Sequence, residues 1–132
     1  MTVGIAPTNG SGPGLQDGQW LLGVAAGNNR SYKNGVTAAG NSKATAFQLP
    51  AGVELIEVDT VAANTGVLMP AAVAGQIVMV FNSGANTLNI FGRGTDTIGN
   101  TATGTARTMA ANASAVFFCA KNGSWAATAL AS

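Results

Sequence analysis

The chain has 132 residues and no histidine; 8% of its residues are charged, 47% are hydrophobic and 18 are glycine. Without histidine, a Ser-His-Asp triad is excluded, and with a single cysteine a zinc site of the His/Cys type is excluded too. The formal net charge of +1 lacks the clustered basic residues that binding to nucleic acid requires. We therefore expect a protein that is not an enzyme, with no catalytic, cofactor-binding or metal-ligating residues and no nucleic-acid partner.

The first segment, residues 1–19, is rich in Gly, Pro, Asn and Ser, and we expect an extended N-terminal arm, with a disordered tail as the alternative. Residues 20–132 are then one domain, long enough to bury a core of its own. Over residues 17–27, a cap at Asp17 and a stop at Gly27 predict one short helix, with a strand as the competing interpretation. The N-terminus resembles no secretory signal, and no apolar run reaches the roughly 20 residues that span a bilayer, so we expect no membrane partner.

The polar stretch 28–43 shows no clear strand signal, and β patterns begin at Thr45. The pattern over 53–61 places Ile56 and Val58 on one face and the acidic residues between and after them on the other. Residues 76–82 are apolar on both faces, which predicts a central strand of a packed sheet. We expect no strand over 99–107 and a turn over 108–113. The predicted strands lie at 45–49, 53–61, 67–69, 76–82, 87–91, 115–120 and 125–130.

Turn residues separate these strands at intervals of roughly 8–12 residues, the spacing expected of an all-β sandwich, jelly roll or barrel. Residues 82–86 are expected to form a hairpin-type turn, and Asn122-Gly123 a two-residue hairpin. A short echo, Leu49-Pro50 and Met69-Pro70, is interpreted as two similar corners, because two copies do not make a repeat protein. The predicted fold is a small β-sandwich or jelly roll.

Two acidic residues, Glu57 and Asp59, share a strand face and suggest a cation site or an acid/base pair. A solvated strand face explains them better, because Glu54 points to the opposite face of a regular strand. Another structural role would be an ion pair between subunits. Its candidate basic partners are Arg30, Lys43, Arg93 and Arg107.

The Gly92-Arg93-Gly94 loop resembles a phosphate cradle, but it has no P-loop Lys-Ser/Thr and no following helix. A flexible surface loop with Arg93 as a contact residue is the better interpretation. Cys119 lies in an apolar, strand-like run and is predicted to be a buried small hydrophobe. Trp20 and Trp125 are expected to be core or interface anchors.

The chain from Ala44 to Leu130, about two-thirds of the sequence, resembles a small family of tailed-bacteriophage virion proteins. The likeness is a pattern of apolar strands and turns, and the polar stretch 28–40 also looks like the connection that these proteins carry. The matching segments are ATAFQL (44–49), VDTVAA (58–63), GVLMPAAVAG (66–75), VMVFNSGANTLNIF (78–91) and the strand around Trp125.

This resemblance implies a jelly-roll capsid decoration, or cement, protein on the outer surface of the virion, made in the host cytoplasm. Its partners would be the major capsid protein and further copies of itself, with a homotrimer favoured and a dimer as the alternative. A β-sandwich module in a tail or fibre that binds a host surface glycan, through loops 28–41 and 92–104, is the competing function.

Overall fold

The computed structural model describes residues 30–128, and every regular element in that range is a β-strand. No helix occurs among these residues, so the all-β prediction is confirmed for them. The predicted arm over 1–19 and the predicted short helix over 17–27 lie outside the described range.

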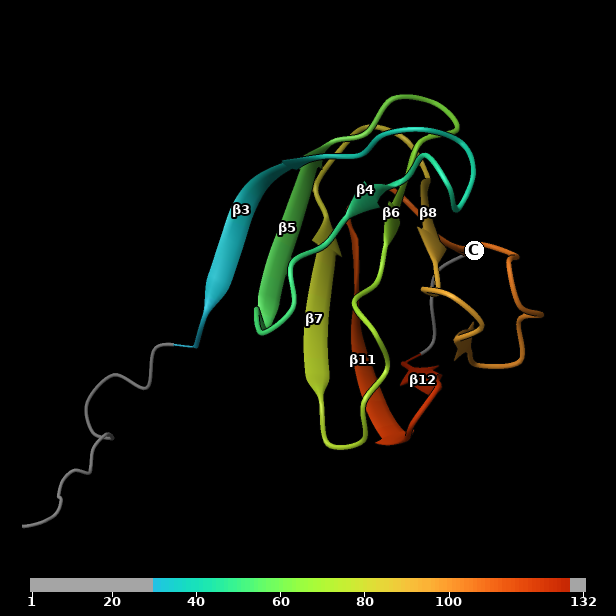
Figure 1. Cartoon of the computed structure of the whole chain (residues 1–132). Coiled ribbons are helices and arrows are strands. Elements are labelled where there is room, and N and C mark those ends of the chain that lie inside the picture. The colour runs from blue at the N-terminus through green and yellow to red at the C-terminus, as the bar shows by residue number, and fades with distance from the viewer. Residues whose placement is uncertain (1–29, 129–132) are drawn as a thin grey trace, which may run out of the picture. The chain divides into compact units, whose positions relative to one another are not determined.

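The larger of the two sheets has six strands, and Figure 1 shows β3, β5, β7 and β11 side by side in one layer. It mixes parallel pairs, such as β5 with β7, and antiparallel pairs, such as β7 with β11. In spatial order its strands are β3 (Tyr32–Thr37), β5 (Leu55–Thr60), β7 (Ile77–Asn82), β11 (Ala113–Lys121), β12 (Ser124–Ala127) and β9 (Thr97–Ile98).

The smaller sheet has four short strands and supplies the other half of the core. Its pairs are parallel except the last, where β10 runs antiparallel to β8. In spatial order the strands are β10 (Arg107–Met109), β8 (Leu88–Phe91), β6 (Gly66–Leu68) and β4 (Phe47–Gln48).

From β3 to β8 the chain alternates between the two sheets, one strand in each, so it winds in successive coils like a solenoid. Each corner takes the chain from one sheet to the other. When the chain returns to a sheet after one full coil, its new strand runs in the same direction as the previous strand of that sheet. Neighbours within a sheet are parallel for this reason. A jelly roll is built from antiparallel Greek keys instead, so this winding does not support the jelly-roll part of the prediction.

The two Leu/Met-Pro corners stack on one another in successive coils. The Leu49 N–H donates to the Leu68 carbonyl at 2.9 Å, and the Met69 N–H donates to the Phe91 carbonyl at 2.8 Å. Proline follows Leu49 and Met69 in each corner, and because it has no N–H it ends the strand there. The sequence echo therefore marks two similar corners, as predicted.

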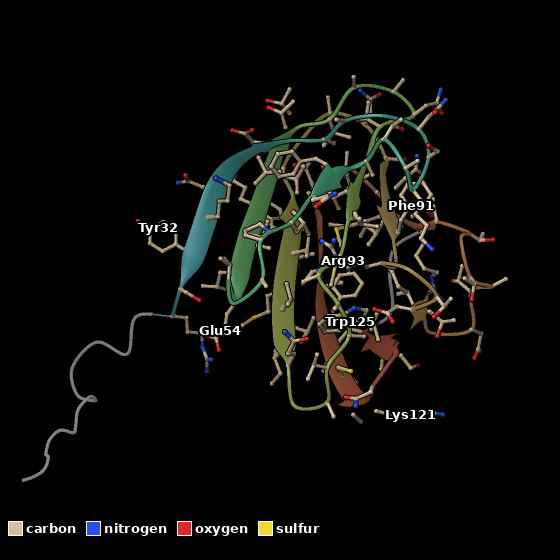
Figure 2. The ribbon with its side chains drawn as sticks, viewed as in Figure 1. Tyr32, Glu54, Phe91, Arg93, Lys121 and Trp125 are labelled. Atoms are coloured by element: carbon tan, nitrogen blue, oxygen red, sulfur yellow. The ribbon has the colours of Figure 1, made fainter. Side chains whose placement is uncertain are left out.

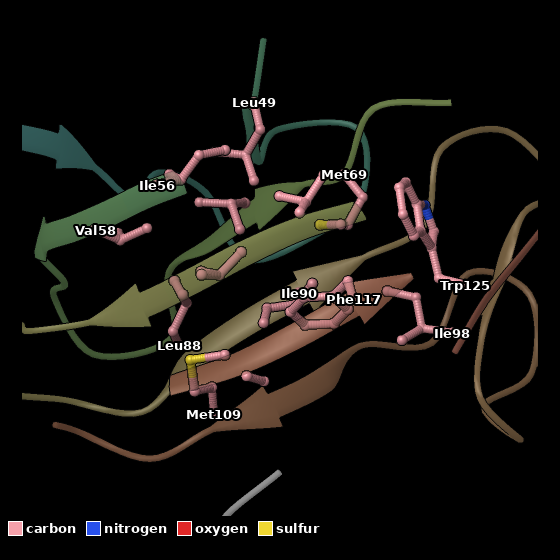
Figure 3. Close-up of a cluster of buried hydrophobic side chains, with 14 of the residues drawn as sticks. Leu49, Ile56, Val58, Met69, Leu88, Ile90, Ile98, Met109, Phe117 and Trp125 are labelled. Atoms are coloured by element: carbon pink, nitrogen blue, oxygen red, sulfur yellow. The ribbon is translucent and has the colours of Figure 1, made fainter. Parts of the chain in front are cut away.

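The core lies between the sheets and is filled by inward-facing side chains from both (Figure 3). Ile56 and Val58 on β5 are buried, as the alternation predicted, and so are Leu88 and Ile90 on β8. Trp125 is fully buried, and its indole Nε1–H donates to the Pro70 carbonyl at 3.3 Å. The largest fully buried side chains are Trp125, Phe117, Leu49, Met69, Leu88, Ile90, Ile98, Met109, Val36, Val58, Val67 and Val80.

One polar side chain, that of Asn82, is fully buried at the end of β7. Its Nδ2 lies within 2.9–3.1 Å of the carbonyl oxygens of Asn86, Met109 and Ala110. Its Oδ1 accepts the Gly84 N–H at 3.0 Å. The side chain thus fastens the β7–β8 connection to the end of β10, and its polar atoms are satisfied without water.

Several local predictions need correction. Residues 32–37 form a strand where none was expected, as do residues 97–98 and 107–109, so the expected turn over 108–113 is shorter. Residues 82–86 form a turn but not a hairpin, because β7 and β8 belong to different sheets. The Asn-Gly hairpin is confirmed, since Lys121 pairs with Ser124.

Candidate docking face

The outer face of the larger sheet carries a row of apolar side chains that crosses four strands. Tyr32 pairs with Leu55, Leu55 with Met79, and Met79 with Val116, so these four residues lie in register across β3, β5, β7 and β11. Neighbouring strands share the same pleat, and all four side chains therefore point away from the core. Figure 2 shows Tyr32 projecting outward from β3.

Further large apolar side chains extend this row on both sides. Ile77 and Phe118 pair across β7 and β11, and Phe81 lies two residues beyond Met79 on β7. Ile77 is 48% exposed, Phe81 40% and Phe118 41%, so β7 is buried on one face only. The prediction that β7 is a central strand is confirmed, but among residues 30–128 nothing covers its second apolar face.

We call the outward-facing apolar set of this sheet the outer face. It comprises Tyr32, Leu55, Ile77, Met79, Phe81, Val116 and Phe118.

An open groove of about 560 Å³ is hollowed into the outer face. Its apolar lining includes Tyr32, Leu55, Met79, Phe81 and Val116, and the charged residues Lys33 and Glu57 also line it. Most of the lining is apolar, so water in the groove is easily displaced by an apolar partner. Such a surface is suited to binding a partner by shape and burial.

Three charged side chains lie on or near this face: Lys33 and Glu57 line the groove, and Asp59 follows on β5. Glu57 accepts a hydrogen bond from the Ser83 hydroxyl at 2.6 Å, and Asp59 accepts one from the Thr60 hydroxyl at 3.1 Å. Both carboxylates face outward from β5, as predicted, and their partners in the fold are hydroxyl groups. In the range 30–128 no group of three potential His, Cys, Asp or Glu ligands comes together. The observed partners of Glu57 and Asp59 are those of a polar strand face.

Of the basic residues considered as partners for these carboxylates, Lys43 donates to the Gly94 carbonyl, and Arg107 lies 3.5 Å from the Thr101 hydroxyl. Arg93, the predicted contact residue of the 92–96 loop, is half-buried.

The loop around Arg93 is anchored by Asp96. The Asp96 carboxylate accepts the Ala72 N–H at 2.8 Å, and the Asp96 N–H donates to the Arg93 carbonyl at 2.9 Å. A Cβ at Gly92 would lie 2.4 Å from the Asp96 carbonyl oxygen, so only glycine fits there. The tight turn requires glycine at position 92, so the presence of Gly92 is explained without a bound phosphate.

Cys119 and Trp125 are both buried, as predicted: Cys119 is 3% exposed and Trp125 is fully buried. The other predicted anchor, Trp20, lies outside the described range. The Cys119 thiol lies 3.0 Å from the Lys121 carbonyl oxygen.

A second, polar depression of about 340 Å³ lies at the end of the smaller sheet and was not predicted. The loops expected to contact a glycan do not form it, because residues 32–37 are a strand and the 92–96 loop lies elsewhere. The sequence signal that could have predicted this depression is the Asn/Thr content of the turns at 64 and 86. The residues that line the depression are Ala63, Asn64, Asn86, Thr87, Asn89 and Thr108.

Comparison with known proteins finds no matching family model, no matching curated protein and no matching solved structure.

The part of the chain described by the structure contains no helix that is long and apolar enough to cross a membrane.

Proposed function

We propose that this chain is a bacteriophage virion structural protein, a capsid decoration protein that associates with copies of itself and stabilises the shell of the major capsid protein from outside. The observation that carries the proposal is the outer face, an exposed and mostly apolar sheet surface that offers binding area. The sequence resemblance over residues 44–130 is the basis for proposing the phage virion as the particle and the major capsid protein as the partner.

The physical properties of the domain suit a mechanical role. Because only 8% of the residues are charged, large contacts form without removing many ions from water. Many weak contacts repeated around a shell add through multivalency, which resists pressure from the packaged genome. We class the two facing sheets as a β-sandwich with solenoid-like connections, an architecture suited to clamping neighbours.

Reconstitution with empty shells tests this proposal. Shells assembled from the major capsid protein of the same phage are mixed with the purified chain and sedimented. We expect saturable co-sedimentation and a higher temperature of shell disruption, because a ligand that binds only the assembled state stabilises it. Shells that sediment without the chain, or that disrupt at an unchanged temperature, would contradict the proposal.

The polar depression favours a second candidate, a tail or fibre module that binds a host surface glycan. Its Asn and Thr side chains, with Asn89 half-buried at the centre of a strand, offer amide and hydroxyl groups to sugar hydroxyls. A glycan array distinguishes the candidates: binding that is lost in Asn89→Ala would favour this function over capsid decoration.

A further inference from the structure

The pair Asn-Gly occurs at two places in the described part of the chain, on β3 at 34–35 and in the β11–β12 hairpin at 122–123; a third pair, at 9–10, lies outside it. Asparagine loses its side-chain amide most readily before glycine, because glycine has no Cβ to keep its backbone nitrogen away from the preceding side chain. The two described pairs have the same sequence but different structural settings, so the fold decides which of them reacts.

The pair on β3 lies in a bulge of an edge strand. The parallel register with β5 shifts between Lys33 and Val36, and the two residues between them, Asn34 and Gly35, have no paired residue on the described strand β5. Both are exposed. Gly35 has a φ of +68°, and a Cβ added there would meet no atom of the described residues within 4 Å. The reacting groups of this pair are therefore open to solvent and free of packing neighbours.

The pair in the hairpin is held at both reacting groups. The Gly123 N–H donates to the Ala72 carbonyl at 2.9 Å, and the Asn122 Oδ1 accepts the Ala74 N–H at 2.8 Å. The backbone nitrogen that would attack and the side-chain carbonyl that it would attack are thus each bonded to the 72–74 corner. Both hydrogen bonds must open before Asn122 can react.

We propose that Asn34 is a site of spontaneous deamidation, a modification that changes the charge of the groove as the protein ages. The Gly35 nitrogen attacks the Asn34 Cγ and forms a C–N bond, which closes a succinimide ring. The bond from Cγ to the side-chain nitrogen breaks, and that nitrogen leaves as ammonia with the proton of the Gly35 N–H. One molecule of solvent water then opens the ring: cleavage of the new bond gives aspartate, and cleavage at the main-chain carbonyl gives isoaspartate.

The modification would change the outer face, because Asn34 lines the groove together with Lys33 and Glu57. The groove gains a second carboxylate, and the formal net charge of the chain falls by one from +1. An apolar partner that docks there must then remove one more charge from water, which weakens docking. This consequence rests on the proposed function, whereas the reaction does not: it proceeds whether or not the chain binds a shell.

The modified chain should keep its fold. The residues of β3 that pair with β5 are Tyr32, Lys33, Val36 and Thr37, and none of them is altered. The extra main-chain carbon of isoaspartate falls in the bulge, where the register already shifts. We therefore expect an unchanged circular dichroism spectrum after deamidation, so the change of charge can be studied in a folded protein.

Peptide mapping of the aged full chain tests the proposal. Trypsin places Asn34 in the peptide 34–43, where fragment ions separate it from Asn41, and Asn122 in the peptide 122–132. The purified chain is incubated at mildly alkaline pH, and mass spectrometry follows the conversion of each amide to an acid. In the native chain Asn34 should be converted at least about tenfold faster than Asn122, because two hydrogen bonds protect the hairpin pair.

Unfolding supplies the matched control. In guanidinium chloride the two Asn-Gly pairs lose their different settings, and Asn34 and Asn122 should be converted at similar rates. Gly35→Ala should slow the conversion of Asn34 roughly tenfold, because the added Cβ hinders the attacking nitrogen, and should leave the rate at Asn122 unchanged. Circular dichroism checks that this variant is folded.

A native chain in which Asn34 is converted no faster than Asn122 would overturn the proposal. So would an Asn34 that stays an amide in the native chain while the unfolded chain is converted. An unchanged rate at Asn34 in folded Gly35→Ala would overturn it as well, because the attacking nitrogen would then not be that of Gly35.

Discussion

Replacing Asn82 with alanine should be among the most destabilising single changes in this domain. The side chain is fully buried and makes four polar contacts, three from Nδ2 to the carbonyls of Asn86, Met109 and Ala110, and one from the Gly84 N–H to Oδ1. Alanine leaves the buried Gly84 N–H and the Met109 carbonyl without partners, and each such group costs about 1–3 kcal/mol. Because the other two carbonyls are partly buried and can reach water, we expect a total loss of about 3 kcal/mol.

Equilibrium unfolding in urea, followed by tryptophan fluorescence and by circular dichroism, measures this loss. Asn89→Ala is the matched control, because Asn89 faces outward from β8, and it should change the free energy of unfolding by less than about 0.5 kcal/mol. Asn82→Asp should be at least as harmful as alanine, since it turns an oxygen toward carbonyl oxygens in place of an N–H donor. If Asn82→Ala lost less than about 1 kcal/mol, the network would not be fastening the connection, and the reasoning would be refuted.

Three further predictions concern the packing and anchoring of the two sheets. Gly66→Ala should lower the free energy of unfolding by about 2 kcal/mol or more, because the added Cβ would lie 2.7 Å from the Asn89 carbonyl oxygen. Urea unfolding measures this loss, and an unchanged urea midpoint would contradict the close approach of Gly66 to Asn89. The Cys119 thiol should be protected from a thiol reagent in the native state and react on unfolding, because it is 3% exposed; rapid native labelling would contradict its burial. Asp96→Ala should cost about 1–2 kcal/mol, because the Ala72 N–H loses its carboxylate acceptor, and a calorimetric melting temperature equal to that of the wild type would argue against this anchor.

The strongest strands could be predicted from the sequence, because their signal is local. Alternation at Ile56 and Val58, and at Leu88 and Ile90, reports directly which face meets a core. Residues 32–37 carried no such signal, since most of their side chains are exposed and Gly35 has a φ of +68°. That strand exists because β5 offers it a parallel edge, which is a tertiary effect.

Connectivity was harder to predict than the strands. The same turn residues serve a hairpin or a crossing between sheets, so residues 82–86 could not be assigned from composition. The stacking of Leu49-Pro50 on Met69-Pro70 was visible only as an echo, because two corners do not establish a period. The winding, and with it the parallel pairing, depends on which sheet each strand joins.

The outer face could likewise be predicted only in part, because some of its features are local in the sequence and others depend on distant strands. The apolar second face of β7 was visible in the sequence, and so was the shortage of charge. The groove was not, because it needs Tyr32, Leu55, Met79 and Val116 in register across four strands, and the first and last of these residues are 84 positions apart in the chain. Register between distant strands is set by packing and is not written in local periodicity.

The most direct test of a structural role in the virion is the copy number of this chain in purified phage particles, measured by quantitative mass spectrometry against the major capsid protein. Capsid decoration predicts a copy number comparable to that of the major capsid protein. A copy number that is a small fraction of it would contradict decoration and would place the chain in the tail, where the glycan-binding candidate becomes the one to pursue.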